Sequence, residues 1–164
     1  MFRDLHFPTP VYIADIKHPT LNQELERDIM AWAKKDKGIT RTNIKGWHSH
    51  TNMNKLPEYK KLVHMLHEAQ KTIYDQEHYE SEPVLGNMWA NINPPGGMNR
   101  AHQHPNSLWS GVYYIKAPKN SGNLKIDDPR SVACMSRPRQ KEGKLPPRLL
   151  REIHYEPIAG RCIM

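Results

Sequence analysis

Apolar residues recur every three or four positions in the first part of the chain, which is the pattern of a helix with one buried face. The first such series consists of Leu21, Leu25, Ile29 and Trp32. Thr20 and Gln23 have the spacing of a capping box, and Gly38 follows the last apolar position as a stop signal. The pattern predicts a helix that begins at Thr20 and ends before Gly38.

A second helical series begins at Pro57, because proline is favoured in the first turn of a helix. Its apolar positions are Leu62, Leu66, Ala69 and Ile73. The periodicity ends after Asp75, so the second helix is expected from Pro57 to about that residue.

Beyond Pro83 the pattern changes to short apolar runs separated by proline, glycine and asparagine, which is typical of strands and turns. An opening strand is also expected before the first helix, at residues 7–16. The other predicted strands cover residues 85–93, 108–115, 123–126 and 150–155, and a last one that begins at Arg161.

Short strands of this kind favour an antiparallel sandwich or barrel, with the two helices bracing one sheet from outside. The expected fold class is α+β. We expect one domain over residues 1–164, with a strand and helices in 1–82 and the β structure in 83–164.

The chain has 164 residues, of which 37% are hydrophobic, so it can form one domain with a modest core. It contains neither an apolar run of the roughly 20 residues that span a bilayer nor a signal-peptide pattern. Its two cysteines, Cys134 and Cys162, lack the spacing of zinc ligands. These features predict a cytoplasmic protein.

The formal net charge of +7 arises largely between Arg130 and Arg151, where prolines interrupt a series of basic residues. Proline removes a backbone donor, so this segment is expected to be a loop. It is either a solvated basic loop or one that closes over an acidic or extended substrate. Charge alone does not indicate a nucleic-acid partner, and we expect neither nucleic acid nor a membrane as partner.

Two histidines, His102 and His104, follow the Gly96-Gly97 turn and precede the run of β-branched and aromatic residues at 108–115. If they belong to a strand, side-chain alternation places both imidazoles on one face. Neutral imidazole suits iron, copper, nickel or zinc. The spacing therefore predicts a metal site with His102 and His104 as ligands.

A second pair, His48 and His50 in Trp47-His48-Ser49-His50, lacks a glycine-rich approach. We interpret it as an ordinary surface or substrate-groove segment. Trp89 and Trp109 are interpreted as core residues between the sheets, with the lining of a substrate mouth as the alternative.

Several motifs follow one another in the second half of the chain. They are Asn93-Pro94-Pro95-Gly96-Gly97, His102-Gln103-His104, Ser110-Gly111-Val112-Tyr113-Tyr114-Ile115, Ser121-Gly122-Asn123-Leu124-Lys125-Ile126 and Asp128-Pro129-Arg130. In this order they resemble the 2-oxoglutarate and Fe(II)-dependent oxygenase family, closest to its prolyl-hydroxylase-like branch and to oxygenase-like proteins of phages and bacteria. The resemblance covers residues 83–164 and implies a double-stranded β-helix, or jelly-roll. It also implies hydroxylation of a peptidyl or small-molecule substrate, with Fe(II) as cofactor and 2-oxoglutarate as cosubstrate.

In that family a histidine, a carboxylate two residues later and a distal histidine hold the iron. His102 matches the first ligand, whereas His104 stands where the carboxylate is usual. An all-nitrogen set can still bind Fe(II), although its affinity and redox potential should differ. Asp127 or Asp128 could supply a carboxylate instead, but an Asp-Asp-Pro sequence more often forms a turn.

The resemblance also implies contacts with the cosubstrate. Tyr114 matches a tyrosine that binds the far carboxylate of 2-oxoglutarate, with a core ring as the equal alternative. Asn91 and Asn93 lie near another cosubstrate-binding position, with strand-end and turn roles as the alternative.

Members of the family continue past the equivalent of Met164 with the distal histidine and an arginine or lysine that pairs with 2-oxoglutarate. His154 does not match that distal ligand. The expectation is therefore a C-terminally truncated oxygenase with an incomplete site and little activity of its own. An open sheet edge of this kind favours self-association.

Two alternatives remain open. Gly96 and the histidine pair fit much of the first motif of the cupins, but the glutamate expected after the second histidine is absent. The other alternative is a non-catalytic, truncated oxygenase that acts as a binding module.

Overall fold

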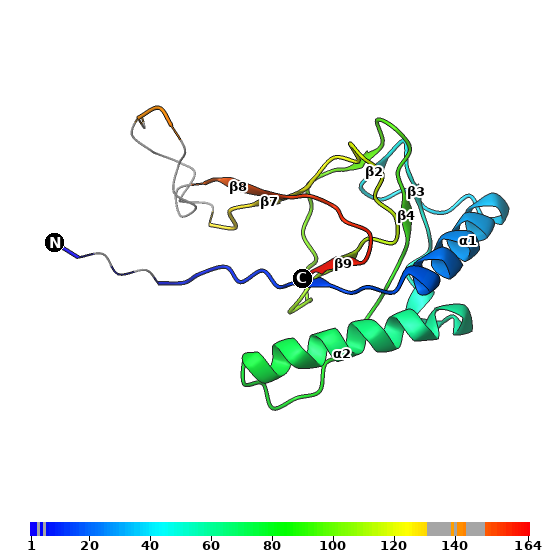
Figure 1. The fold of residues 1–164 in the computed structure, drawn as a ribbon, viewed down its shortest axis with the longest axis horizontal. Coiled ribbons are helices and arrows are strands. Elements are labelled where there is room, and N and C mark those ends of the chain that lie inside the picture. Colours follow the sequence, from blue (N-terminus) through cyan, green and yellow to red (C-terminus); the bar gives the residue numbers. More distant parts are fainter. Residues whose placement is uncertain (3, 5, 131–138, 140, 144–149) are drawn as a thin grey trace. The chain divides into compact units, whose positions relative to one another are not determined.

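A computed structural model describes residues 1–2, 4, 6–130, 139, 141–143 and 150–164. These residues form two compact units (Figure 1). The first unit comprises Met1–Lys116 and Ala159–Met164, and the second unit comprises Ala117–Ile158. The single domain expected over residues 1–164 stays a prediction.

The first helix, α1, spans Pro19–Lys35 and buries the predicted face with Leu25 and Ile29. It begins one residue earlier than predicted, and the capping box of Thr20 and Gln23 is wrong, because the N-cap position is His18 and no side chain caps it. Pro19 in the first turn explains the start: proline has no N–H to satisfy and its φ is already helical.

The chain leaves α1 through a tight turn at Asp36. The Gly38 amide donates to Oδ1 of Asp36 at 2.7 Å, and the Trp47 indole donates to the Asp36 carbonyl at 2.9 Å. The Gly38 hydrogen bond is the main reason why the pKa of Asp36 lies below its ordinary value. Gly38 adopts a φ of 68°, which glycine tolerates best. This turn brings the segment after Gly38 back against α1.

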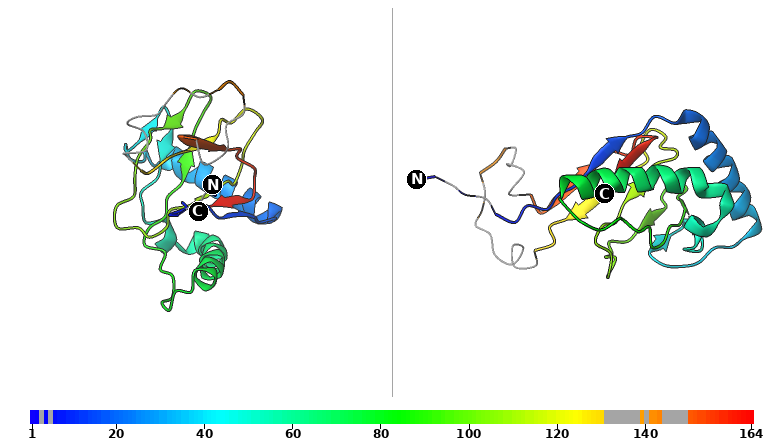
Figure 2. Two further views of the ribbon diagram at one scale, coloured as in Figure 1. Left: turned by 90° about the vertical axis from the view of Figure 1, so that its left-hand side faces the viewer. Right: turned by 90° about the horizontal axis from the view of Figure 1, so that it is seen from below.

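The second predicted helix is confirmed as α2, Lys60–Gln76. Two 3₁₀ turns, η1 (Met53–Lys55) and η2 (Pro57–Tyr59), precede it, so the predicted first turn at Pro57 is 3₁₀ rather than α-helical. Both long helices lie in the first unit, as Figures 1 and 2 show.

The core of the first unit joins both helices to the segments around residues 53 and 90. Its buried members are Leu25, Ile29, Met53, Tyr59, Leu62, Met88 and Ala90. Trp32, Trp47 and Ile92 pack against them.

The described strands form small antiparallel sheets. The sheet of three strands contains β1 (Ile13–Asp15), β9 (Arg161–Ile163) and β6 (Val112–Tyr113). β9 lies in the middle, so Ile163 is opposite Ile13 on one side and Val112 on the other. Figure 2 shows β1 and β9 side by side.

Two pairs of short strands complete the first unit. β2 (Asn43–Ile44) pairs with β5 (Met98–Asn99), and β3 (Trp47–His48) pairs with β4 (Asn91–Ile92). β2, β3 and β5 were not predicted. The strands expected at 7–16, 85–93 and 108–115 are shortened to β1, β4 and β6, because strand length depends on the partners available.

In the second unit, β7 (Leu124–Asp127) pairs with β8 (Glu152–Tyr155), which confirms the strands predicted at 123–126 and 150–155. Lys125 bridges the two strands, with its Nζ 2.7 Å from a Glu152 oxygen and 3.3 Å from Asp127. Most of the predicted basic loop between 130 and 151, and Cys134 with it, lies outside the described residues.

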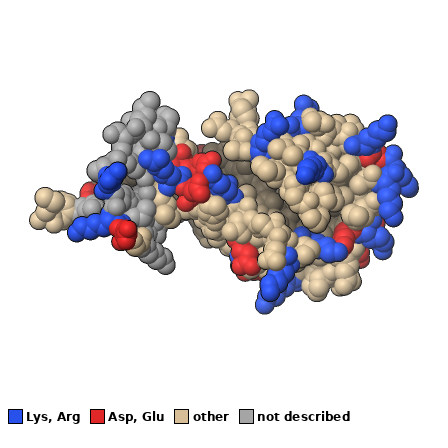
Figure 3. Space-filling model, turned by 90° about the horizontal axis from the view of Figure 1, so that it is seen from above, with Lys and Arg blue, Asp and Glu red and all other residues tan. Residues whose placement is uncertain are grey.

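The combination of helices and antiparallel strands confirms the mixed α and β composition that was expected. The jelly-roll arrangement itself stays a prediction, because the described sheets have only two or three strands. No helix among the described residues is long and apolar enough to cross a membrane. In the view of Figure 3, the lysines and arginines lie in separate groups with uncharged surface between them.

Candidate metal centre

His102 and His104 lie on the segment that follows β5. The approach to them is the tight turn at Pro94, where the Gly97 amide donates to the Pro94 carbonyl at 2.7 Å and Gly96 has a φ of 75°. Residues 101–104 are not part of a strand, so strand alternation does not place the two imidazoles on one face. Pro105 follows directly and favours an extended backbone at His104.

The two imidazoles nevertheless come together. Their ring centroids lie 4.8 Å apart with the planes at 82°. Nδ1 of His102 donates to the Arg100 carbonyl at 2.7 Å, which fixes the proton on Nδ1 and leaves the lone pair on Nε2. A histidine ligand with its second nitrogen bonded to a carbonyl is the usual arrangement at metal sites.

His104 is half-buried, whereas His102 is exposed. Burial, and after it the neighbouring His102, lowers the pKa of His104. Burial therefore favours the neutral ring, which is the form that binds a metal ion.

A row of aromatic rings continues from His104 towards the interior of the first unit. The Trp89 ring centroid lies 5.4 Å from that of His104, and the His48 centroid lies 5.5 Å from that of Trp89. His48 is 4% exposed and its neighbour Ser49 is fully buried, so the interpretation of residues 47–50 as surface or groove is wrong for these two. The pairing of β3 with β4 places His48 and Ser49 in the interior. No local sequence pattern predicts that pairing.

The asparagines proposed for the cosubstrate lie on and after β4. Asn91 is exposed and stands opposite His48 in the pairing of β3 with β4. The side-chain Nδ2 of Asn93 donates to Oδ1 of Asn99 on β5 at 3.1 Å. A Cβ on Gly46 would lie 2.2 Å from Oδ1 of Asn93, so glycine there leaves room for this side chain.

Tyr114 follows β6 and is held by its backbone to the end of the chain. Its amide donates to the Arg161 carbonyl at 2.9 Å, and its carbonyl accepts from Gly160 at 2.7 Å. The residue is half-buried, and burial raises the pKa of its hydroxyl. The phenol thus stays protonated at neutral pH and can donate a hydrogen bond to an anion.

The two imidazoles are the candidate donors for a transition-metal ion. Two imidazoles, one with its Nε2 lone pair directed away from the backbone, fit a first-row ion. In the part of the chain that the structure describes, no group of three or more His, Cys, Asp or Glu side chains could hold a metal. Cys162 is 1% exposed and burial raises its thiol pKa to about 11, so it offers no thiolate at neutral pH.

A comparison with protein families finds one match over the segment that contains every candidate residue. Residues 87–164 match the family described as "Putative 2OG-Fe(II) oxygenase". This match bears out the resemblance to the 2-oxoglutarate and Fe(II)-dependent oxygenases for residues 87–164. A comparison with curated proteins finds no match.

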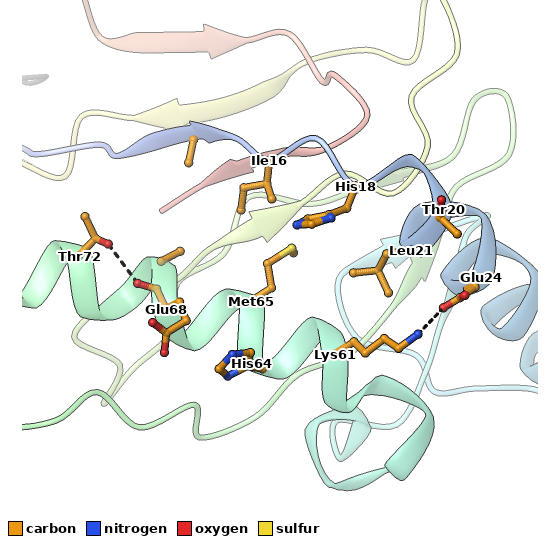
Figure 4. A pocket seen from close by; sticks show the side chains of 12 residues that line it. Ile16, His18, Thr20, Leu21, Glu24, Lys61, His64, Met65, Glu68 and Thr72 are labelled. Atoms are coloured by element: carbon orange, nitrogen blue, oxygen red, sulfur yellow. Dashed lines mark hydrogen bonds and ion pairs between the residues drawn. The ribbon is translucent and has the colours of Figure 1, made fainter.

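A groove of the first unit lies elsewhere, between α1, α2 and the end of β1. It encloses about 730 Å³. Its apolar lining includes Ile16, Leu21 and Met65, and the ion pair of Glu24 with Lys61 joins the two helices at one end (Figure 4). The candidate metal ligands are not among the described residues that line it.

Proposed function

We propose that this chain supplies His102 and His104 as two ligands of the iron site of a 2-oxoglutarate-dependent oxygenase. The observation that carries the proposal is the adjacency of the two imidazoles, with the His102 proton fixed on Nδ1, inside the segment that matches the oxygenase family. The chemistry that Fe(II) and 2-oxoglutarate supply when bound is oxidation of a substrate C–H bond, coupled to decarboxylation of the cosubstrate.

The chain's own residues would bind and orient the reactants. His102 and His104 would hold the metal through neutral nitrogens, which leave its double positive charge without the usual carboxylate. The protonated Tyr114 hydroxyl would donate to a carboxylate of 2-oxoglutarate. Asn91 and Asn93 would donate amide hydrogen bonds to the same cosubstrate. The substrate class we propose is a peptide or a small molecule.

Metal binding is the direct test. Co(II), a paramagnetic substitute for Fe(II), is titrated into the metal-free chain while the histidine ring resonances are followed by NMR. We expect those of His102 and His104 to broaden first. His102→Ala and His104→Ala should each weaken binding about tenfold or more, because removal of one of two ligands removes the chelate. The matched control is His64→Ala, an exposed histidine on α2.

Equal Co(II) affinity of all four proteins would contradict the proposal, as would broadening that starts at other histidines. Succinate formation from 2-oxoglutarate with Fe(II) and ascorbate is the second assay. With only two donors among the described residues, we expect turnover no faster than with free Fe(II). Turnover above that level should depend on His102, and turnover that survives His102→Ala would rule out the assigned ligand.

A further inference from the structure

Trp89 is enclosed by two imidazoles that come from different segments. The His48 ring is nearly parallel to the indole, with an interplanar angle of 9°, and the His104 ring meets it at 41°. The centroid separations of 5.5 and 5.4 Å are those of rings in contact. The indole therefore connects the buried part of the first unit to a candidate metal ligand.

The backbone around Trp89 is held firmly. The Ser49 amide donates to the Ala90 carbonyl at 3.0 Å, and the Ala90 amide donates to Oγ of Ser49 at 2.9 Å. On the other side, the Met53 amide donates to the Met88 carbonyl at 3.0 Å. Since Met88 and Ala90 are buried in the core, alternation directs Trp89 to the opposite face.

The ring behind Trp89 is fixed as well. His48 is 4% exposed, and its Nδ1 donates to the Ser49 carbonyl at 2.6 Å. Burial and this hydrogen bond restrict the orientation of the His48 ring, which stacks on the indole.

His104, in contrast, lies on a segment without strand pairing. Its backbone carbonyl accepts from the Ser107 amide at 3.3 Å, which closes a local turn but does not orient the ring. Among the described residues, the His104 ring contacts Trp89 and the exposed His102. Of these two neighbours, Trp89 is the one anchored to the core.

We propose that Trp89, backed by His48, is a positioning residue that sets the orientation of the His104 imidazole for metal binding. This inference rests on the proposed function, since it assumes that His104 is a ligand. Aromatic contact replaces the carboxylate or carbonyl that more often orients a ligating histidine. The indole does not touch the metal in this role.

The test compares Trp89→Phe, which keeps an aromatic face, with Trp89→Leu, which removes it. In the metal-free chain, we expect the ring-current shift of the His104 ring protons to persist in the phenylalanine variant and to vanish in the leucine variant. The Co(II) dissociation constant should rise about tenfold for Trp89→Leu and less than threefold for Trp89→Phe, in line with losses seen for groups that orient a ligand.

Trp109→Leu is the matched control, because Trp109 is also half-buried but packs on Tyr12 with centroids 5.3 Å apart. It should leave the His104 shifts and the Co(II) affinity unchanged. Circular dichroism shows whether each variant is folded. A folded Trp89→Leu variant with wild-type His104 shifts or Co(II) affinity would overturn the proposal.

A measurement on the unaltered chain keeps the proposal testable if Trp89→Leu does not fold. Nuclear Overhauser effects between the Trp89 and His104 rings, with the His104 side-chain couplings, should report one ring orientation. An average over several orientations would overturn the positioning role. Absence of Co(II) binding by the unaltered chain would instead refute the proposed function, so the two failures are distinguishable.

Discussion

Replacement of Ser49 by alanine tests the hydrogen bonds that hold the backbone next to Trp89. Ser49 is fully buried, and its hydroxyl has two partners. It accepts a hydrogen bond from the Ala90 amide at 2.9 Å and donates one to the His50 carbonyl at 2.8 Å. Ser49→Ala removes both bonds and leaves the Ala90 amide without its acceptor in a residue that is 7% exposed.

The expected loss follows from the two bonds. An unsatisfied buried donor costs about 1–3 kcal/mol, and a lost hydrogen bond costs about 0.5–1.5 kcal/mol. We therefore expect Ser49→Ala to lower the free energy of unfolding by about 3 kcal/mol. With a urea m-value of about 2 kcal/mol/M, the midpoint of unfolding should fall by about 1.5 M.

Urea unfolding followed by circular dichroism measures this shift. Ser81→Ala is the control, because Ser81 is exposed, and surface substitutions change stability by about 0.5 kcal/mol or less. The His104 ring shifts in the folded variant should also change, since the Ala90 bond holds the backbone next to Trp89. A midpoint within about 0.2 M of the unaltered chain would refute the reasoning about the Ala90 amide.

Two further predictions concern the backbone and the buried thiol. Gly38→Ala should lower the free energy of unfolding more than Gly122→Ala. A Cβ at Gly38 would lie 2.3 Å from the His48 carbonyl oxygen, whereas a Cβ at Gly122, which has a φ of 79°, would meet no atom of the described residues within 4 Å. Equal losses in urea unfolding would contradict this. Burial raises the pKa of Cys162 from 9.0 to about 11. The stability that the buried, neutral thiol contributes is therefore fully present below pH 9 and is lost as the pH rises towards 11. Relative to Cys162→Ala, the unaltered chain should lose up to about 3 kcal/mol of stability over that interval, and parallel pH profiles would contradict the burial argument.

Both helices could be predicted because their signals are local. Leu25 and Ile29 lie one turn apart and face the core, so the sequence period reports the buried face directly. The start of α1 was misplaced because Thr20 resembles a cap, while Pro19 offers the better first turn.

Strand length and pairing could not be predicted in the same way. β9 lies between β1 and β6, which come from widely separated parts of the chain. The two-residue strands β2 and β3 form because partners reach them from β5 and β4, and nothing within the strands themselves specifies this.

The candidate site also contains residues that the sequence predicts and residues that it does not. His102 and His104 were found from their spacing and from the motifs around them, although the structure brings the rings together without a strand. The support formed by His48 and Trp89 was not found, because it depends on the pairing of two distant segments. A sequence pattern can mark ligands, whereas the residues that orient them are set by tertiary contacts.

The departure of this chain from the usual ligand pattern and the contact with Trp89 are connected. An imidazole at position 104 can place its ring against the indole, and a carboxylate cannot. His104→Asp restores the usual carboxylate ligand and offsets part of the positive charge of the metal ion. We therefore expect the Fe(II) affinity, measured by anaerobic calorimetry, to be preserved or increased. Because the aspartate makes no ring contact, adding Trp89→Leu to His104→Asp should cost no further affinity, whereas Trp89→Leu alone costs about tenfold. Additive losses in this double-mutant cycle would show that Trp89 acts on the metal site by a route other than the His104 ring.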